Sequence, residues 1–242
     1  MILKIVVICF LLITLFSLCY AQCGCTQKGI KIADFNVGDM VLSPVEILKI
    51  NGYKAADGEK WPKNELRYTF DPSFPDKNKN PVRDFLKAYE KELGNCIKFK
   101  EEKSGVFATV VTGGGCSANV GYNSRYPLKV TLADPCVNKR NVKHEFTHSL
   151  GFQHEHTRPD RDNNLNIQFN NVKKNLCANF YLCEGCKTTT PYDFDSIMQY
   201  PSEAFTCNGK ETILRKNGGK IAFNMEVTKL DAKKVRDYYG CA

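Results

Sequence analysis

The chain has 242 residues, of which 43% are hydrophobic and 25% are charged. This composition is that of a globular protein with room for a sizeable core, and it excludes an intrinsically disordered chain. The formal net charge is +8, with lysines spread along the whole chain. We interpret it as a solvated basic surface and expect no nucleic-acid partner.

The N-terminus has the pattern of a secretory signal peptide. Lys4 supplies a positive charge, residues 5–18 are almost wholly apolar, and Ala21 is a small residue before the expected cleavage point. The apolar run is short for a membrane anchor, and no later segment is long and apolar enough to cross a bilayer. We therefore expect a signal peptide at residues 1–21 and a secreted, extracellular protein.

The cysteines predict disulfides. The sequence holds 12, and ten remain once Cys9 and Cys19 leave with the signal peptide. An even number in an oxidising compartment indicates bridging first. Cys183-Glu-Gly-Cys186 could also suggest a zinc knuckle or a redox site, but with Cys177 and Cys207 nearby we favour disulfides.

Along the chain, residues 22–51 show no helical period long enough for a domain. Residues 66–70 then alternate like a half-buried strand. Asn80 and Pro81 have the pattern of an N-cap followed by proline at the first helical position, and Gly94 should end that helix. Further short strands are expected at residues 97–99, 106–111, 119–122 and 130–132.

A second helix is expected to begin near Val137 and to contain the first histidines. Beyond Gly151 the sequence is loop-rich and cysteine-rich until residues 231–239, which predict a closing helix. This order predicts an α+β fold with two lobes: a twisted, mostly N-terminal β-sheet with two helices, and an irregular, disulfide-stapled C-terminal lobe.

All four histidines of the chain fall between residues 144 and 156. His144 and His148 are one helical turn apart, about 40° around the axis, so both imidazoles can reach one metal. In a continued helix His154 would lie about 240° from His148, so the helix must break, and Gly151 can take the left-handed conformation needed. Three imidazoles with one open position predict one catalytic Zn²⁺ per chain.

Glu145 lies about 100° around the helix from His144, near the metal but not as a ligand. Zinc lowers the pKa of a bound water towards about 7, and Glu145 can accept its proton as general base. The same carboxyl can return the proton to a leaving amine, so the site predicts amide hydrolysis. His156 is left out of the metal site and is expected to form a local hydrogen bond.

The motif resembles that of the metzincin zinc proteases, and the astacin family in particular. Residues 144–162 match the pattern H-E-x-x-H-x-x-G-F-x-H-E-x-x-R-x-D-R-D at every fixed position. Residues 196–200, Ser-Ile-Met-Gln-Tyr, resemble the astacin methionine turn, with Gln199 in place of the usual histidine. The resemblance makes Met198 an apolar floor for the metal and Tyr200 a side chain that stabilises the tetrahedral intermediate.

The resemblance also implies disulfides and an astacin-like catalytic domain at residues 52–242. The implied bridges are Cys96–Cys241 and Cys116–Cys136. The remaining cysteines of the C-terminal lobe go beyond the minimal pattern, and we expect two further bridges among them in one of three pairings. They are Cys177, Cys183, Cys186 and Cys207.

Residues 35–39, Phe-Asn-Val-Gly-Asp, resemble the F-x-G-D of astacin propeptides. Asp39 would then be the zymogen switch of a propeptide at residues 22–51, released by cleavage near Asn51-Gly52. A plain Gly-Asp turn, or a thiolate switch at Cys23 or Cys25, is the alternative. In relatives the new amino terminus pairs with the glutamate after the third ligand, which makes Glu155 structural.

The expected function is hydrolysis of peptide bonds in extracellular proteins, with protein or peptide substrates and a monomeric enzyme. An extended substrate is expected to pair with an edge strand formed by Asn119, Val120, Gly121 and Tyr122. Tyr122 stands where the family often has arginine. The alternatives are a catalytically silent zinc protein that binds partners through the cleft, and a disulfide-rich toxin or inhibitor with incidental histidines.

Overall fold

The computed structural model describes residues 23–24, 36–37, 39–41 and 58–241. The expected signal peptide (1–21) and the expected cleavage point near residues 51–52 lie outside them. The strands are β1 Asn36–Val37, β2 Met40–Val41, β3 Glu65–Phe70, β4 Lys98–Glu101, β5 Ala108–Val111, β6 Cys116–Asn119, β7 Leu128–Leu132, β8 Leu165–Ile167 and β9 Ile213–Arg215. The helices are α3 Asp76–Glu92, α4 Lys139–Ser149 and α5 Lys229–Tyr239, and several short 3₁₀ turns connect them.

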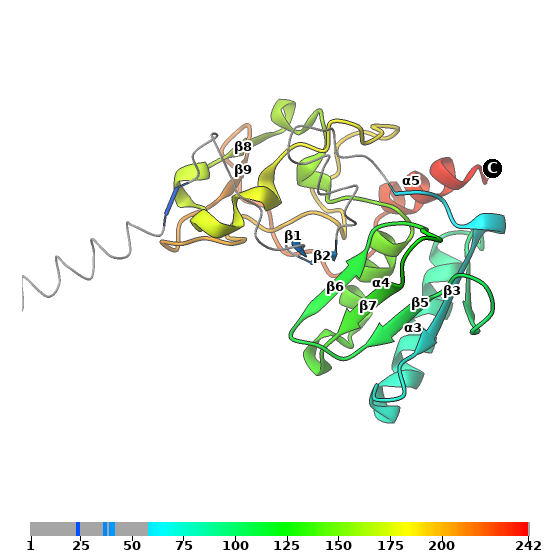
Figure 1. Ribbon diagram of the computed structural model, residues 1–242. Helices are drawn as coiled ribbons and strands as arrows, with labels where there is room; N and C mark the ends of the chain where they lie inside the picture. Colours follow the sequence, from blue (N-terminus) through cyan, green and yellow to red (C-terminus); the bar gives the residue numbers. More distant parts are fainter. Residues whose placement is uncertain (1–22, 25–35, 38, 42–57, 242) are drawn as a thin grey trace, which may run out of the picture.

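Seven strands form one mixed sheet in the order β1-β2-β6-β7-β5-β3-β4. β3 pairs in parallel with β4 and β5, β5 pairs in parallel with β7, and β6 runs antiparallel to β7. The helices α3 and α4 lie together against this sheet, and β1 and β2, the strands at one edge of it, lie on the side nearer the rest of the molecule (Figure 1). β2 is parallel to β6, with Met40 opposite Ala118.

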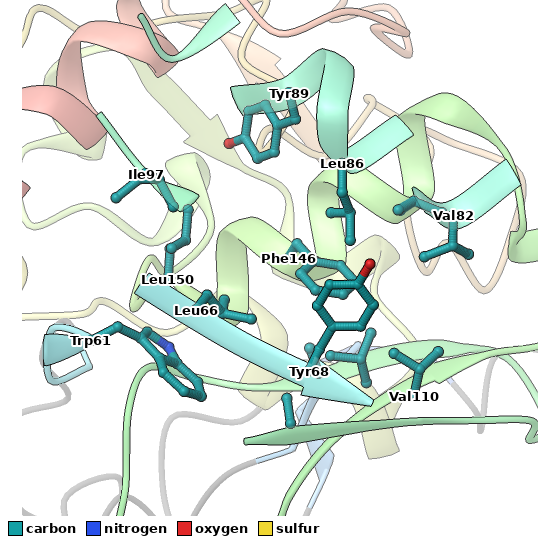
Figure 2. Close-up of a cluster of buried hydrophobic side chains, with 14 of the residues drawn as sticks. Trp61, Leu66, Tyr68, Val82, Leu86, Tyr89, Ile97, Val110, Phe146 and Leu150 are labelled. Carbon is teal, nitrogen blue, oxygen red and sulfur yellow. The ribbon is translucent and has the colours of Figure 1, made fainter. Parts of the chain in front are cut away.

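The larger hydrophobic core lies between the sheet and these helices, and Figure 2 shows its centre. Side chains of β3 alternate between the two faces of the sheet, and this places Leu66 and Tyr68 in the core. Leu86 of α3 and Phe146 of α4 meet them from the helices, and both are almost completely buried. Burial of this apolar surface supplies most of the free energy that holds the sheet against α4.

The C-terminal part has its own smaller core, built on the hairpin of β8 and β9 and including Phe180 and Tyr200. α5 closes the chain: Thr228 and Asp231 form a capping box at its start, and Gly240 takes a φ of +75° at its end. The two cores confirm the predicted α+β fold with two lobes.

The first helix is longer than the sequence predicted. It begins at Asp76, so Pro81 lies inside it. The additional turn is fixed by Asp134, whose carboxylate accepts hydrogen bonds from Lys77 Nζ and Asn78 Nδ2, each at 2.6 Å. We predicted from Asn80-Pro81 that the helix begins at Pro81. That prediction was wrong by about one turn, because these tertiary contacts stabilise the residues before it in the helix.

The disulfides follow the resemblance only in part. Cys96–Cys241 and Cys116–Cys136 are both present. Cys183 bonds Cys186, whereas Cys207 bonds Cys23, so the expectation that the four cysteines of the C-terminal lobe pair among themselves is wrong. Cys177 is disulfide-bonded as well. Among the described residues no helix is long and apolar enough to cross a membrane.

Candidate metal centre

The helix α4 positions the first two histidines, His144 and His148. Asn138 caps it by accepting a hydrogen bond from the Asn141 N–H at 2.9 Å, and every residue from Val142 to Ser149 is buried. The Nδ1 atoms of His144 and His148 lie 2.8 Å from the carbonyl oxygens of Ile197 and Phe152. Because a carbonyl only accepts, each Nδ1 carries the proton and each Nε2 presents a lone pair to the site.

Gly151 ends α4 and brings back the third histidine, as its spacing predicted. It has a φ of +109°, and its N–H donates to the His148 carbonyl at 2.8 Å. Its own carbonyl accepts from the Gly58 N–H at 2.7 Å. The chain then returns so that His154 Nε2 lies 3.2 Å from His148 Nε2.

Asp39 completes the cluster from a distant part of the chain. Its Oδ2 lies 2.8 Å from His144 Nε2, and its Oδ1 lies 2.9 Å from His154 Nε2 and 3.6 Å from His148 Nε2. One ligand atom from each of the four residues falls within 4.8 Å of all the others. Asp39 thus stands at the fourth corner that three imidazoles leave open.

The electrostatics of the cluster suit a divalent cation. Burial lowers the pKa of His144, and it lowers that of His154 to about 4, so these imidazoles are neutral. Burial opposes ionisation of Asp39, but the neighbouring His154 and His144 hold its pKa well below the usual range. Three lone-pair nitrogens and a carboxylate facing one another at these distances fit tetrahedral Zn²⁺, whose bonds of about 2.0–2.1 Å place ligand atoms about 3.3 Å apart.

Glu145 lies next to this cluster without joining it. Its side chain is 1% exposed, and its Oε2 has no hydrogen-bond partner among the described residues. Burial, reinforced by the charge of Asp39, raises the pKa of Glu145 well above its usual value. A carboxyl group held in this way can accept a proton and give it back near neutral pH.

Tyr200 reaches the cluster from the other lobe. Its hydroxyl donates to Asp39 Oδ1 at 3.2 Å, and its ring lies 4.3 Å from the His154 ring. The His156 ring also stacks against it, at 4.2 Å with an interplanar angle of 27°. Burial, and then the charge of Asp39, raises the phenol pKa well above the usual range, so the hydroxyl keeps its proton.

His156 is the residue whose place the sequence did not reveal. Its Nε2 lies 2.8 Å from the carbonyl oxygen of Asn179, far along the chain, so the expected local hydrogen bond is wrong. It is fully buried against Tyr200 and Phe180. The sequence shows only that His156 follows a metal ligand by two residues. It does not show that Asn179 and Tyr200, from a distant segment, contact it.

Glu155 and Met198 surround the site without entering it. Glu155 is 1% exposed and accepts from Arg158 Nη1 at 2.8 Å, from the Asp193 N–H at 3.0 Å, and from Lys234. Met198 is 2% exposed, and its carbonyl accepts from the Glu155 N–H at 2.9 Å. The two residues therefore join the third histidine to the turn that carries Tyr200.

The expected substrate strand is displaced towards the N-terminus: β6 covers Cys116–Asn119, so of the four predicted residues only Asn119 lies in it. β6 ends at Asn119, and Val120 and Gly121 leave it because Gly121, with a φ of +71°, donates its N–H to the His148 carbonyl. Tyr122 instead forms an isolated bridge with Glu59. The outer edge of β6 is occupied by β2, through Met40 and Val41.

Comparison with known proteins places the chain in a family. Residues 54–240 match the family model of Astacin, a family of peptidases. Low choriolytic enzyme of Oryzias latipes is 29% identical over 212 residues, covering 84% of this chain and 77% of the relative. Astacin-like metalloprotease toxin 1 of Loxosceles intermedia is 32% identical over 173 residues, covering 70% of this chain and 64% of the relative.

The chain spans a smaller share of some relatives. Zinc metalloproteinase nas-6 of Caenorhabditis elegans is 30% identical over 189 residues, which is 75% of this chain and 54% of the relative. Among solved structures, high choriolytic enzyme 1, a hatching enzyme zinc-protease from Oryzias latipes, matches with a TM-score of 0.69 over 77% of this chain and 95% of that one, at 24% identity, and supports the fold. With the three-histidine cluster, these matches show that the chain belongs to the astacin family of zinc metalloproteinases.

Proposed function

We propose that the chain is a secreted zinc endopeptidase made as a zymogen, and that it hydrolyses peptide bonds of extracellular proteins. The observation that carries this proposal is the convergence of three imidazole Nε2 atoms with a carboxylate oxygen at the remaining corner. Such a centre has the ligand set of a catalytic rather than a structural zinc site. The buried Glu145 supplies the proton acceptor that a purely structural site would not need.

The residues divide the chemistry among them. Bound zinc would polarise the scissile carbonyl and lower the pKa of the attacking water. Glu145 takes the proton of that water and returns it to the leaving amine nitrogen. The Tyr200 hydroxyl, which donates to Asp39 in this structure, would donate instead to the oxyanion of the tetrahedral intermediate.

Asp39 would keep the zymogen inactive. Its carboxylate occupies the corner where water and substrate must bind, and it also engages the Tyr200 hydroxyl. Residues 1–21 would be the signal peptide, residues 22–51 the propeptide and residues 52–242 the catalytic domain, which we expect to be monomeric. The disulfides support export to an oxidising compartment.

The substrate would replace the propeptide at the sheet edge. β2 now pairs with β6, so departure of Met40 and Val41 would expose the backbone groups of Ala118 and Asn119. An extended peptide can add to such an edge through backbone hydrogen bonds. Val120, Gly121 and Tyr122 would border this site rather than extend the strand.

A casein digestion tests the proposal. The processed protein should cleave casein, and removal of zinc with phenanthroline should stop it. Glu145→Gln should lower kcat by at least about 10²-fold while zinc content stays at one per chain, because the amide cannot accept the proton. If the variant cleaves as fast as the parent, Glu145 is not the base. If the parent binds zinc but cleaves nothing, the catalytically silent alternative is correct.

A further inference from the structure

A disulfide joins the start of the expected propeptide to the C-terminal lobe. Cys23 bonds Cys207, which lies 184 residues further along the chain. The backbone reinforces the contact: Cys23 forms an antiparallel bridge with Lys173, and the Gly24 N–H donates to the Val172 carbonyl at 3.0 Å. The Cys207 N–H donates to the Asn171 carbonyl at 2.9 Å. Residues 171–173 therefore form a docking surface for Cys23 and Gly24.

The same N-terminal part is held a second time at the metal centre. The Ala118 N–H donates to the Asp39 carbonyl at 2.8 Å, and Met40 is 4% exposed. The Asp39 carboxylate lies among the three histidines. Both attachment points precede residues 51–52 in the chain, where we expect the activating cut.

We infer that the N-terminal fragment stays on the enzyme after that cut, as a second chain bonded through Cys23–Cys207. This inference rests on the proposed zymogen function. Hydrolysis of one peptide bond adds one water and leaves the disulfide intact, so Asp39 remains tethered beside the metal centre. Tethering keeps a ligand at an effective concentration on the order of millimolar, so Asp39 continues to compete with substrate.

Two reactions can release the fragment. One is a second hydrolysis between Gly24 and Asp39. The other is reduction of Cys23–Cys207, together with the disulfide of Cys177, to thiols by dithiols that are themselves oxidised to disulfides. The one-cut form is therefore a distinct, partly inhibited state, and full activity requires one of these two steps.

The sequence allows the cuts to be made separately. No glutamate lies between residue 22 and Glu46, whereas Lys28 and Lys31 lie between Cys23 and Asp39. Limited digestion of the full chain with a glutamate-specific protease should cut after Glu46. Intact mass without reductant should then equal the uncut chain plus one water, and reductant should separate the two pieces.

A lysine-specific protease should then free the fragment that carries Asp39. We expect casein cleavage to rise at least about tenfold over the form cut only after Glu46, because the tethered competitor is lost. Lys28→Gln/Lys31→Gln is the matched control and should remain tethered and slow under both proteases. Asp39→Ala should retain the fragment yet lose the inhibition, which separates the tether from the zymogen switch.

Two results would overturn the inference. One is release of the fragment after the Glu46 cut without reductant. The other is its retention by the variant Cys23→Ala/Cys177→Ala/Cys207→Ala, in which the disulfide-bonded Cys177 is replaced as well, because the fragment would then be held by something other than a disulfide to the C-terminal lobe. A retained fragment with no casein cleavage in any form would refute the proposed peptidase function while leaving the tether in place.

Discussion

The Tyr200 ring packs against two imidazole rings, and its hydroxyl reaches the metal cluster. The rings of His154 and His156 both contact it, at 4.3 and 4.2 Å between centroids, while the hydroxyl donates to Asp39. Tyr200→Phe keeps the ring contacts and removes only the donor. We expect kcat to fall by about 10²-fold with KM little changed, because the donor acts on the oxyanion and not on bound substrate.

Steady-state kinetics on a peptide substrate, after removal of the expected propeptide, measure this effect. Phe85→Leu, a change in a partly buried side chain of α3 that packs against the larger core, is the control for a general loss of packing. An unchanged kcat in Tyr200→Phe would remove the hydroxyl from the mechanism.

At the residue scale the sequence predicted what depends on spacing along one helix. His144, His148 and His154 are close in the chain, so helical geometry together with the turn at Gly151 brings them together. The contact of His156 with Tyr200 depends on a loop from the other lobe, and no local pattern encodes it. Tyr200 itself was found only through the resemblance of its turn.

Among the elements, the end of α4 controls the third ligand, and Gly151 is its weak point. With a φ of +109°, any side chain here is strained, and a Cβ would lie 3.0 Å from the Gly58 carbonyl oxygen. Gly151→Ala should cost about 1–3 kcal/mol of stability and loosen His154. We expect weaker zinc binding in a chelator competition and a lower midpoint of denaturant unfolding.

Gly114→Ala is the matched control, because nothing lies within 4 Å of a Cβ built there and its φ is not in the left-handed region. It should leave zinc affinity unchanged. If Gly151→Ala and Gly114→Ala bound zinc equally well, the turn at residue 151 would not be what positions His154.

The contact between α3 and the edge strand β4 gives a pH-dependent prediction. Arg83 donates to both carboxylate oxygens of Glu101, at 2.6 and 2.8 Å, and holds the pKa of Glu101 below its usual 4.5. A depressed pKa contributes stability that is present above pH 4.5 and is lost as pH falls through the folded-state pKa. Much of the pair is exposed, so the contribution is at most about 1 kcal/mol.

Glu101→Gln removes the titrating group while keeping the size of the side chain. The variant should be less stable than the parent at about pH 7 and equally stable at a pH below the folded-state pKa, where the parent carboxylate is protonated. Urea unfolding followed by fluorescence at both pH values measures the difference. A stability gap that is the same at both pH values would contradict the assignment.

The prediction of whole elements succeeded where the hydrophobic pattern is clear: alternate residues of β3 are buried, and α3 has one apolar face. It was wrong where a distant residue adds a contact. Asp134 extends α3 backwards past Pro81, and the His148 carbonyl draws Gly121 out of the expected strand. Neither partner is near in sequence, so no window of neighbouring residues could predict them.

Across the whole molecule, cysteine pairing is the feature least accessible from sequence, because spacing does not fix connectivity. Cys23–Cys207 was missed for this reason, and it joins the expected propeptide to the C-terminal lobe. The two bridges implied by family resemblance are present. Among the described residues, bridges between distant cysteines thus stand beside the very local bridge Cys183–Cys186.

Loop length should separate the effects of these bridges on stability. Cys96–Cys241 spans 145 residues and Cys183–Cys186 spans 3. Chain entropy assigns about 5 kcal/mol to the first and about 2 kcal/mol to the second, since the longer loop restricts the unfolded chain more. Cys96→Ala/Cys241→Ala should therefore lower the free energy of unfolding by about 3 kcal/mol more than Cys183→Ala/Cys186→Ala does.

Guanidinium unfolding of both double variants in a Glu145→Gln background measures this difference, since the background prevents self-digestion. The slope of the free energy against denaturant should rise in both, because the unfolded chain exposes more surface once a bridge is lost. The increase should be larger for the long loop. Equal losses of stability would mean that native contacts around Cys183, which donates its N–H to the Thr157 carbonyl, matter as much as loop closure. The short bridge would then serve to position the chain that follows the third histidine.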